Sequence, residues 1–527
     1  MQKVKKMLSN LPKWNTPSPS NYLTLKEWMF YIVGGMGAYG AGAFIQFVTL
    51  SAGIYVAAAL NIDVMHITYI GLLTSAVTII TSPLVSWMID NTNSKYGKFR
   101  PYLIWLPIPI IICYFALGQV VSLFSSYTAM LVAYAIVFNI LNFLNRIYTL
   151  AFSSIIQVMT PVTQERTNLM SIGTFFTSLG PTLASMIYPI IANRIYADGE
   201  VSGVNKLGAI QWIVPILASV FLALGLLVAF GVKERMVLPK EFKNKQKFSQ
   251  GIKKTFENKY FWITNISAVL GSFRAISTGF TLWIIVYIIY PSFIAKGRET
   301  AAAYLQTIIV TIIGDACVPG MLLAPWLIKK FGKKNLIIFT YLGATVATAA
   351  MVFLQNPYAL LAMIYLVTLF NGLQVVTSPS VQSEIYDYQQ YKTGDRLEGF
   401  LSQFGTMIVT IAGMLFAFVT PAVYKRYGYT NDTQVLYNTD VLFGIIRAMC
   451  IIGAASGILS TIPYFFYDLS EKQHGRIMQI LRVRANRLDG LCDDQTAKEL
   501  ENRIKNGEEN VLDYFEESET TVPPETL

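Results

Sequence analysis

The sequence predicts an all-α integral membrane protein with twelve spanning helices. Its 527 residues are 54% hydrophobic and only 14% charged, and the mean hydropathy is +0.46. Soluble proteins carry about 25% charged residues, so this chain has too few polar side chains to cover a soluble body. Apolar stretches of about 20 residues or more recur along it, and each is long enough to cross a bilayer as a helix.

Twelve spans can be placed by the length of the apolar runs. They lie near residues 29–57, 66–90, 102–121, 127–160, 169–195, 210–232, 259–290, 300–329, 335–354, 358–386, 397–424 and 440–467. An even number of spans places both ends of the chain on the same side of the membrane.

Lysine and arginine indicate which side that is. They give the chain a net charge of +10, and they gather in the N-terminal tail and in alternate connections, at residues 95–100, 233–254, 329–334 and 392–396. Because basic loops stay in the cytoplasm, we expect both termini there and the protein in the cell (plasma) membrane. The polar N-terminus predicts no cleavable signal peptide, so the first span is expected to target the chain.

The long basic connection divides the chain into two halves. We expect a cytoplasmic tail at 1–28, a six-helix bundle at 29–232, a cytoplasmic loop at 233–258, a second six-helix bundle at 259–467 and a cytoplasmic tail at 468–527. A basic turn with a central glycine follows the second helix of each half. Two equivalent halves around a central cavity are typical of secondary transporters.

Three charged side chains, Arg146, Arg274 and Asp315, fall near the middle of predicted spans. Each costs about 2.5–3.5 kcal/mol there on insertion scales, so each is expected to face a cavity or a partner. Polar residues at helical spacing give the first, fourth, seventh and tenth spans one polar face each. The predicted substrate-binding residues on these faces are Gln46, Asn142, Asn145, Arg146, Thr149, Arg274, Asn371 and Gln374.

Simpler roles compete with binding at several of these positions. Gly35, Gly42 and Thr49 are better explained by close packing of helices. For Gln46 and the two asparagines of the fourth span, packing and binding explain the pattern equally well. Asp315 is expected to neutralise one of the buried arginines, and proton transport by its carboxylate is the less favoured alternative.

The motifs of several other protein classes are missing from the sequence. Two histidines and four scattered cysteines predict neither a metal site nor a disulfide framework. No phosphate-binding loop or catalytic constellation is found, which argues against an enzyme and against an ATP-driven pump. No basic patch with interleaved aromatics suggests nucleic-acid binding. The expected partners are a small solute and the lipid bilayer, with no cofactor and a monomeric protein.

The C-terminal tail has its own helical pattern on a basic background. Its apolar positions are Ile477, Ile480, Leu481 and Leu488. Such an amphipathic helix suits the anionic inner leaflet, so we predict that this stripe faces the membrane. The acidic end of the tail is expected to be solvated and partly disordered.

Four segments between the predicted spans carry a resemblance to a known family. They are DNTNSKYGKFRPY at 90–102, ERTNL at 165–169, ENKYF at 257–261 and EIYDYQQYKTGDRLEG at 384–399. Over about 30–470 the chain resembles, in register, the glycoside–pentoside–hexuronide:cation symporter family (melibiose-permease-like) of the major facilitator superfamily. The resemblance implies the twelve-helix major facilitator fold, alternating access and uptake of a sugar, glycoside or sugar acid with a cation.

The chain departs from this family at the cation site. By register, acidic ligands of the second helix fall at Thr78 and Ser82, and a lysine of the eleventh falls at Thr410. Sodium usually wants a carboxylate among its oxygen ligands, so sodium coupling is disfavoured. The candidate cation-coupling residues, for a proton or a sodium ion, are Thr78, Ser82, Asp315 and Thr410.

The chain also departs from the family at the sugar site. The acids that hold sugar hydroxyls in the family fall at Gly42 and Thr149, while Arg146 and Arg274 add positive charge. Arginine binds carboxylates and sulfates with two parallel hydrogen bonds. The sequence therefore predicts an anionic or strongly polar solute, such as a uronate or a sulfated sugar.

Charged residues near the cytoplasmic helix ends form a predicted gate. An ion-paired layer between the halves would hold this face shut and open when the halves rock. The predicted gate residues are Asp90, Arg100, Arg166, Glu384, Asp387 and Arg396.

Two other functions stay open at the level of the sequence. A facilitator or exporter of another amphiphile, such as a lipid or drug, should have an apolar groove open to the bilayer. A non-transporting membrane sensor would use the tail of about 60 residues as its output.

Overall fold

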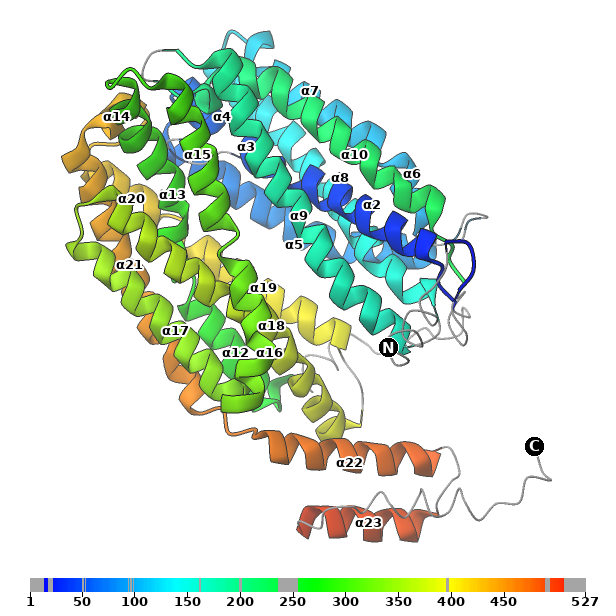
Figure 1. Ribbon diagram of the computed structural model, residues 1–527. Coiled ribbons are helices and arrows are strands. Elements are labelled where there is room, and N and C mark those ends of the chain that lie inside the picture. The colour runs from blue at the N-terminus through cyan, green and yellow to red at the C-terminus, as the bar shows by residue number, and fades with distance from the viewer. Residues whose placement is uncertain are drawn as a thin grey trace, which may run out of the picture.

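The computed structural model describes residues 14–17, 22–49, 52, 54–92, 94, 97, 99–160, 163–198, 201–235, 255–394, 398–488 and 493–506. Within them, eleven helical segments are long and apolar enough to cross a membrane. The fifth predicted span is occupied by a further helix, α9, which is 34 residues long but more polar. Each of the twelve predicted spans therefore coincides with helix, and the predicted fold class is confirmed (Figure 1).

The N-terminal bundle is built from the first six spans. Its helices are α2 (Leu25–Ala43), α3 (Ile45–Val48), α4 (Tyr55–Leu60), α5 (Val64–Asn91), α6 (Arg100–Trp105), α7 (Pro107–Leu123), α8 (Tyr127–Met159), α9 (Thr163–Tyr196) and α10 (Val214–Gly231). The first predicted span, 29–57, was too long, since helix α3 ends at Val48 and α4 is a separate short helix. An apolar run alone could not reveal that break.

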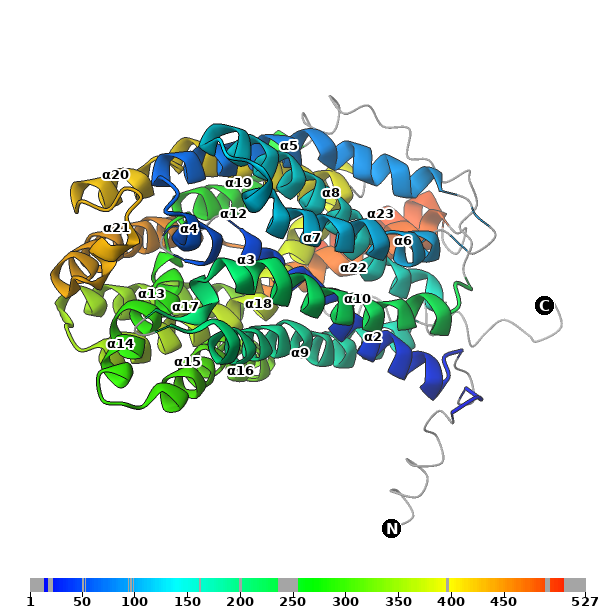
Figure 2. The same ribbon diagram turned by 90° about the horizontal axis from the view of Figure 1, so that it is seen from above.

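The C-terminal bundle is built from the last six spans. Its helices are α12 (Lys259–Leu270), α13 (Phe280–Ile284), α14 (Tyr290–Ile294), α15 (Glu299–Gly314), α16 (Cys317–Phe331), α17 (Lys333–Ala350), α18 (Pro357–Thr393), α19 (Glu398–Phe416), α20 (Val419–Arg426) and α21 (Thr439–Phe465). The bundles meet along two seams, α9 against α15 and α5 against α19 and α20. Figure 2 shows these seams on opposite sides of the molecule.

Glycines let helices of the N-terminal bundle approach closely. A Cβ added to Gly180 would lie 2.0 Å from the carbonyl oxygen of Met36, and one added to Gly35 would lie 2.3 Å from Thr177. The packing role predicted for Gly35 is confirmed. It was wrong for Gly42, where an added Cβ would meet only the Asn145 amide, at 3.7 Å. Gly42 therefore leaves room beside a polar side chain instead of holding two helices together.

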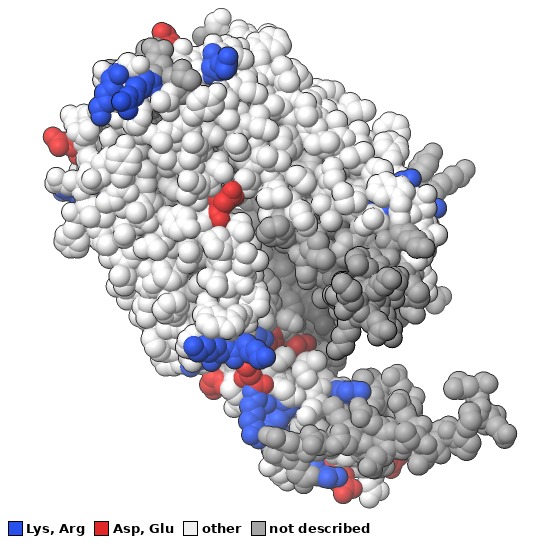
Figure 3. Space-filling view, in the orientation of Figure 1, with Lys and Arg blue, Asp and Glu red and all other residues white. Residues whose placement is uncertain are grey.

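Hydrogen bonds join the bundles at the end opposite the basic connections. Trp283 Nε1 donates to the carbonyl oxygen of Ala52 at 3.0 Å, and Asn193 Nδ2 donates to Gln306 Oε1 at 2.8 Å. At the other end, Figure 3 shows lysine and arginine side chains gathered where the second bundle meets helix α22 (Glu471–Leu488). These outer contacts close the seam between the bundles toward the outside, as one of the two arrangements of an alternating-access carrier requires.

The C-terminal tail forms two helices, α22 and α23 (Asp494–Asn506), at the cytoplasmic end of the second bundle (Figure 1). The prediction that its apolar stripe faces the inner leaflet was wrong for Ile477 and Ile480. Ile477 packs in a cluster with residues of α12, α17 and α18, and Ile480 packs against α23. The stripe is buried because α18 extends beyond the predicted span, to Thr393, and offers an apolar face of its own.

An ion pair and a hydrogen bond hold the turn from the last span into α22. The Asp468 carboxylate accepts hydrogen bonds from Lys259 Nζ and the Tyr260 hydroxyl, both at 2.7 Å. The hydrogen bond from Lys259 lowers the pKa of this carboxyl below its usual range. Asp468 therefore stays ionised at neutral pH and ties the start of the tail to α12.

A buried ion pair holds the cytoplasmic end of the N-terminal bundle. Arg235 Nη2 donates to both carboxylate oxygens of Glu27, at 2.8 and 2.9 Å, and Nη1 donates to the Met159 carbonyl at 3.2 Å. Glu27 is only 5% exposed and also completes a capping box with Thr24 at the start of α2. These contacts join the start of α2 to the ends of α8 and α10.

We expect Glu27→Gln to lower the free energy of unfolding by about 1.5–3 kcal/mol, because hydrogen bonds to charged groups contribute that much. The measurement is the melting temperature of the protein purified in detergent. Asp198→Asn is the control, since its pair with Lys206 is exposed and exposed pairs contribute about 1 kcal/mol at most. Equal melting temperatures for the two variants would contradict the role of this ion pair.

Candidate functional site

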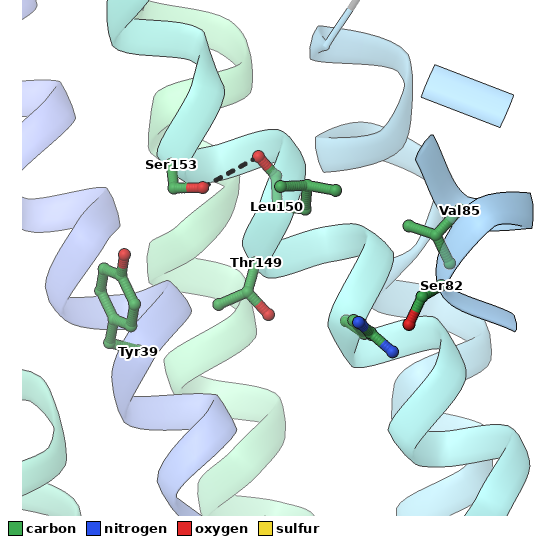
Figure 4. A pocket seen from close by; sticks show the side chains of 7 residues that line it. Tyr39, Ser82, Val85, Thr149, Leu150 and Ser153 are labelled. Atoms are coloured by element: carbon green, nitrogen blue, oxygen red, sulfur yellow. Dashed lines mark hydrogen bonds between the residues drawn. The ribbon is translucent and has the colours of Figure 1, made fainter. Parts of the chain in front are cut away.

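A cavity of about 280 Å³ opens in the N-terminal bundle between α2, α5 and α8. Its volume is just below the range of about 300–1,000 Å³ usual for small-molecule sites. Figure 4 shows Tyr39 facing Thr149 across it, with Ser82 on the far wall. Its lining residues are Tyr39, Ser82, Val85, Arg146, Thr149, Leu150 and Ser153.

Arg146 supplies the positive charge of this cavity. Its Nη1 donates to the backbone carbonyl of Thr78 at 3.0 Å, which ties α8 to α5. It forms no ion pair with any described residue. A half-buried guanidinium held by one neutral oxygen keeps most of its five donors for other acceptors. The predicted placement of Arg146 beside a cavity is thus confirmed by the geometry.

Among the other predicted polar residues of the N-terminal bundle, one lines the cavity and two bond elsewhere. Thr149 lines the cavity and donates to the backbone carbonyl of Asn145. Asn142 Nδ2 is used within its own helix, on the carbonyl of Phe138. Gln46 lies outside the cavity lining and reaches Ser185 of α9 at 3.4 Å. Only Arg146 and Thr149 of the predicted binding set therefore belong to the cavity.

The seventh span is interrupted at the depth where Arg274 lies. Helix α12 ends at Leu270 and a 3₁₀ turn begins at Ile276. The Ser456 hydroxyl of α21 bridges the break: it donates to the Leu270 carbonyl at 2.6 Å and accepts from the Phe273 N–H at 3.2 Å. Because both freed backbone groups are satisfied by one hydroxyl, the break can persist inside a membrane.

Arg274 and Gln374, both members of the predicted binding set, contact each other inside the C-terminal bundle. Arg274 Nη2 donates to Gln374 Oε1 at 2.9 Å, and the guanidinium lies 3.6 Å from the centroid of the Tyr341 ring. Arg274 Nε and Gln374 Nε2 are buried without a hydrogen-bond partner. Two unused donors thus belong to one hydrogen-bonded pair of side chains, and each costs about 1–3 kcal/mol while unsatisfied. Asn371 lies one helical turn before Gln374 on α18.

Asp315 does not neutralise an arginine, and that expectation was wrong. It lies between α15 and α16, at a break in the eighth span. Its Oδ1 accepts a hydrogen bond from the Thr182 hydroxyl of α9 at 2.7 Å. The side chain of Asp315 therefore points across the seam to the other bundle. Both arginines bond to the neutral partners described above.

Two hydroxyls of the predicted cation-coupling set bond to their own helices. Ser82 donates to the Thr78 carbonyl at 2.6 Å, and Thr410 donates to the Thr406 carbonyl at 2.8 Å. The Thr78 carbonyl also holds Arg146. A guanidinium thus lies at the position that the resemblance gives to a metal cation, while Thr410 lies on α19 of the other bundle.

The predicted gate side chains that the structure describes bond within their own bundles. Glu384 accepts hydrogen bonds from Lys333 and from Tyr467, and Asp387 lies 3.0 Å from His474 Nε2 of α22. All of these contacts lie within the second half of the chain. Of the other predicted gate residues, Asp90 and Arg166 lie in helices α5 and α9 but their side chains are not described, and Arg396 lies outside the described residues.

Arg100 is the remaining described gate residue. Its Nε donates to the Ala229 carbonyl at 2.8 Å, at the end of α10 in its own bundle. A gate that closes in the opposite arrangement would have to release this contact, so the gate role stays a prediction.

Three important contact residues carry no signal in the sequence. Thr182, Tyr341 and Ser456 lie among other hydroxyl side chains of their helices, which are common in packed spans. Only their position opposite Asp315, Arg274 and the broken seventh span marks them as functional candidates.

Comparison with known proteins agrees with this architecture. The family model described as MFS/sugar transport protein matches residues 30–471. The isoprimeverose transporter of Lactiplantibacillus pentosus is 24% identical over 78% of this chain and 82% of its own length. The glucuronide carrier protein homolog of Escherichia coli is 22% identical over 78% of this chain and 85% of its own length.

The fold is shared with solved transporters. The crystal structure of the nucleoside transporter NupG superposes with a TM-score of 0.53 at 13% identity, covering 84% of this chain and 98% of that one. The relatives are transporters and not enzymes. The chain is a multi-pass protein of the plasma membrane and belongs to the MFS/sugar transport protein family of the major facilitator superfamily.

Proposed function

We propose that this protein carries a sugar, glycoside or sugar acid across the membrane as a monomer, with preference for a solute that bears an anionic group. The observation that supports the preference is that two guanidinium groups at membrane depth, Arg146 and Arg274, have no carboxylate partner in the described part of the chain. A carboxylate or sulfate would satisfy such donors with charge-assisted hydrogen bonds.

The cavity of the N-terminal bundle supports sugar binding as well. Tyr39 offers a ring on one wall, and Ser82 and Thr149 offer hydroxyls on the others (Figure 4). A site with one apolar face and a few polar groups fits a ring that carries hydroxyls. Among the relatives, one is named for isoprimeverose and one for glucuronides. The Arg146 guanidinium, which has no carboxylate partner among the described residues, favours the acidic class here.

The coupling ion that this site supports best is a proton. A sodium site at Thr78 and Ser82 would have to share the Thr78 carbonyl with the Arg146 guanidinium. The repulsion between two cations at hydrogen-bonding distance makes that arrangement unfavourable. We therefore propose uptake that does not require sodium.

We expect Arg146→Gln to reduce uptake of an acidic sugar at least about tenfold, because a hydrogen bond to a charged group contributes about 1.5–3 kcal/mol and 1.4 kcal/mol corresponds to tenfold. The measurement is uptake of a radiolabelled glucuronide and of a neutral glycoside into vesicles. Arg482→Gln, an exposed change on α22, is the control. Uptake of neutral sugars alone, unchanged in Arg146→Gln, would refute the proposed preference.

We expect Gln374→Leu and Arg274→Lys to raise the KM for the acidic sugar about tenfold or more. Gln374→Leu removes one of the two unused donors, and lysine cannot present the planar fork that stacks on Tyr341. KM values from concentration series in proteoliposomes test this, with Gln355→Leu in an exposed loop as control. Unchanged KM values in both variants would assign Arg274 and Gln374 to packing alone.

A further inference from the structure

Asp315 occupies an unusual place among the charged residues of this chain. It lies between α15 and α16, halfway along the eighth span, where the helix is interrupted. Its backbone N–H still bonds to Thr311 and its carbonyl to Val318, so the break is ordered. The carboxylate also lies before the first turn of α16, where the N-terminal end of a helix favours negative charge. The position before the first turn of α16 therefore favours an ionised Asp315 carboxylate at this depth.

The side-chain partner of Asp315 comes from the other bundle. The Thr182 hydroxyl of α9 donates to Oδ1 at 2.7 Å, and α9 and α15 form one of the two seams between the bundles (Figure 2). This hydrogen bond lies deeper in the membrane than the outer contacts at Gln306 and Trp283. Rocking of the bundles would change the distance between these two side chains.

Cationic groups are missing from the described surroundings of Asp315. The titratable group closest in the chain is Cys317, whose thiol interacts with the carboxylate. On α9 the facing group is the Thr182 hydroxyl, which does not titrate, and Arg194 is twelve residues further on, about 18 Å along a helix. Helix α13 carries no ionisable side chain.

The remaining neighbours of α15 and α16 use their ionisable groups elsewhere. Tyr341 of α17 lies under Arg274, and Glu384 and Asp387 of α18 pair with Lys333 and His474. The tyrosines of the segment that joins α13 to α14 and of α14 itself, Tyr287 and Tyr290, are buried toward the outer end. Asp315 is left with Thr182 as its side-chain hydrogen-bond donor.

We propose that Asp315 and Thr182 form the proton-coupling site of this transporter. In this arrangement Thr182 donates to the carboxylate. In the proposed cycle the proton is released toward the cytoplasm from this arrangement, because a donated hydrogen bond favours the ionised form. When the outer side opens and Thr182 moves away, a carboxylate without a donor at membrane depth binds a proton from outside. One proton bound outside and released inside per cycle would drive uptake. The inference rests on the proposed sugar transport.

The first experiment separates coupling from transport. Proteoliposomes with wild-type protein, Asp315→Asn or the control Asp440→Asn, which lies in the exposed first turn of α21, are assayed for sugar exchange and for accumulation driven by an inside-alkaline pH gradient. We expect Asp315→Asn to keep exchange within about twofold of wild type and to lose accumulation, while Asp440→Asn keeps both. Accumulation by Asp315→Asn at the wild-type level would overturn the proposal.

The second experiment changes the donor. Thr182→Val should raise the pH at which Asp315 titrates, because the ionised form loses its hydrogen bond, and Thr182→Ser should restore the wild-type midpoint. The readout is the protonated carboxyl band that disappears in Asp315→Asn, followed by infrared difference spectroscopy across a pH series. An Asp315 band that titrates equally in all three proteins would reject the role of Thr182. A wild type without any such band would reject proton binding.

The infrared readout needs no sugar, so the two proposals can fail separately. If the wild type exchanges no sugar but the Asp315 band titrates and shifts in Thr182→Val, the proton site stands and the proposed solute class is wrong. If sugar exchange is normal and accumulation follows a sodium gradient instead of the pH gradient, the proton site is wrong and sugar transport stands.

Discussion

A charge at membrane depth has to be satisfied by the protein itself, and this constraint organises the whole structure. Arg146 uses a backbone carbonyl of α5, Arg274 uses an aromatic face and an amide, and Asp315 uses a hydroxyl of the opposite bundle. Each partner is neutral. The charges are therefore stabilised without being cancelled, and a solute or a proton can still bind to them.

The contacts within the N-terminal bundle are strong, whereas those between the bundles are weak. Within the N-terminal bundle, glycines such as Gly180 bring backbones into contact, and the pair of Glu27 and Arg235 fixes three helix ends. Between the bundles, the outer closure depends on neutral groups such as Asn193 and Gln306. A neutral hydrogen bond contributes only about 0.5–1.5 kcal/mol net, so a few of them can be broken and remade in each transport cycle.

Three of the interrupted spans carry a polar or charged side chain at or next to the break. The first span breaks at Phe44 before Gln46, the seventh at Arg274 and the eighth at Asp315. Interrupted helices are how many secondary transporters form sites within the bilayer, because freed backbone groups are tolerated only where protein or water satisfies them. In this chain Ser456 does so for the seventh span. The breaks at Arg274 and Asp315 thus coincide with charges whose proposed roles are solute binding and proton coupling.

The spans, the topology and the charges at membrane depth could all be predicted from the sequence, because hydrophobic length and the side that carries lysine and arginine are local properties of a chain. The polar face of α8 that places Arg146 and Thr149 in the cavity was predictable too, since helical spacing is also local. The groups that those charges meet became visible only once the helices were packed. Thr182 is 133 residues from Asp315. Ile477 was predicted to face lipid but is buried, because α18 packs against it. Contacts of this kind depend on how helices far apart in the chain pack, and no local pattern encodes that arrangement.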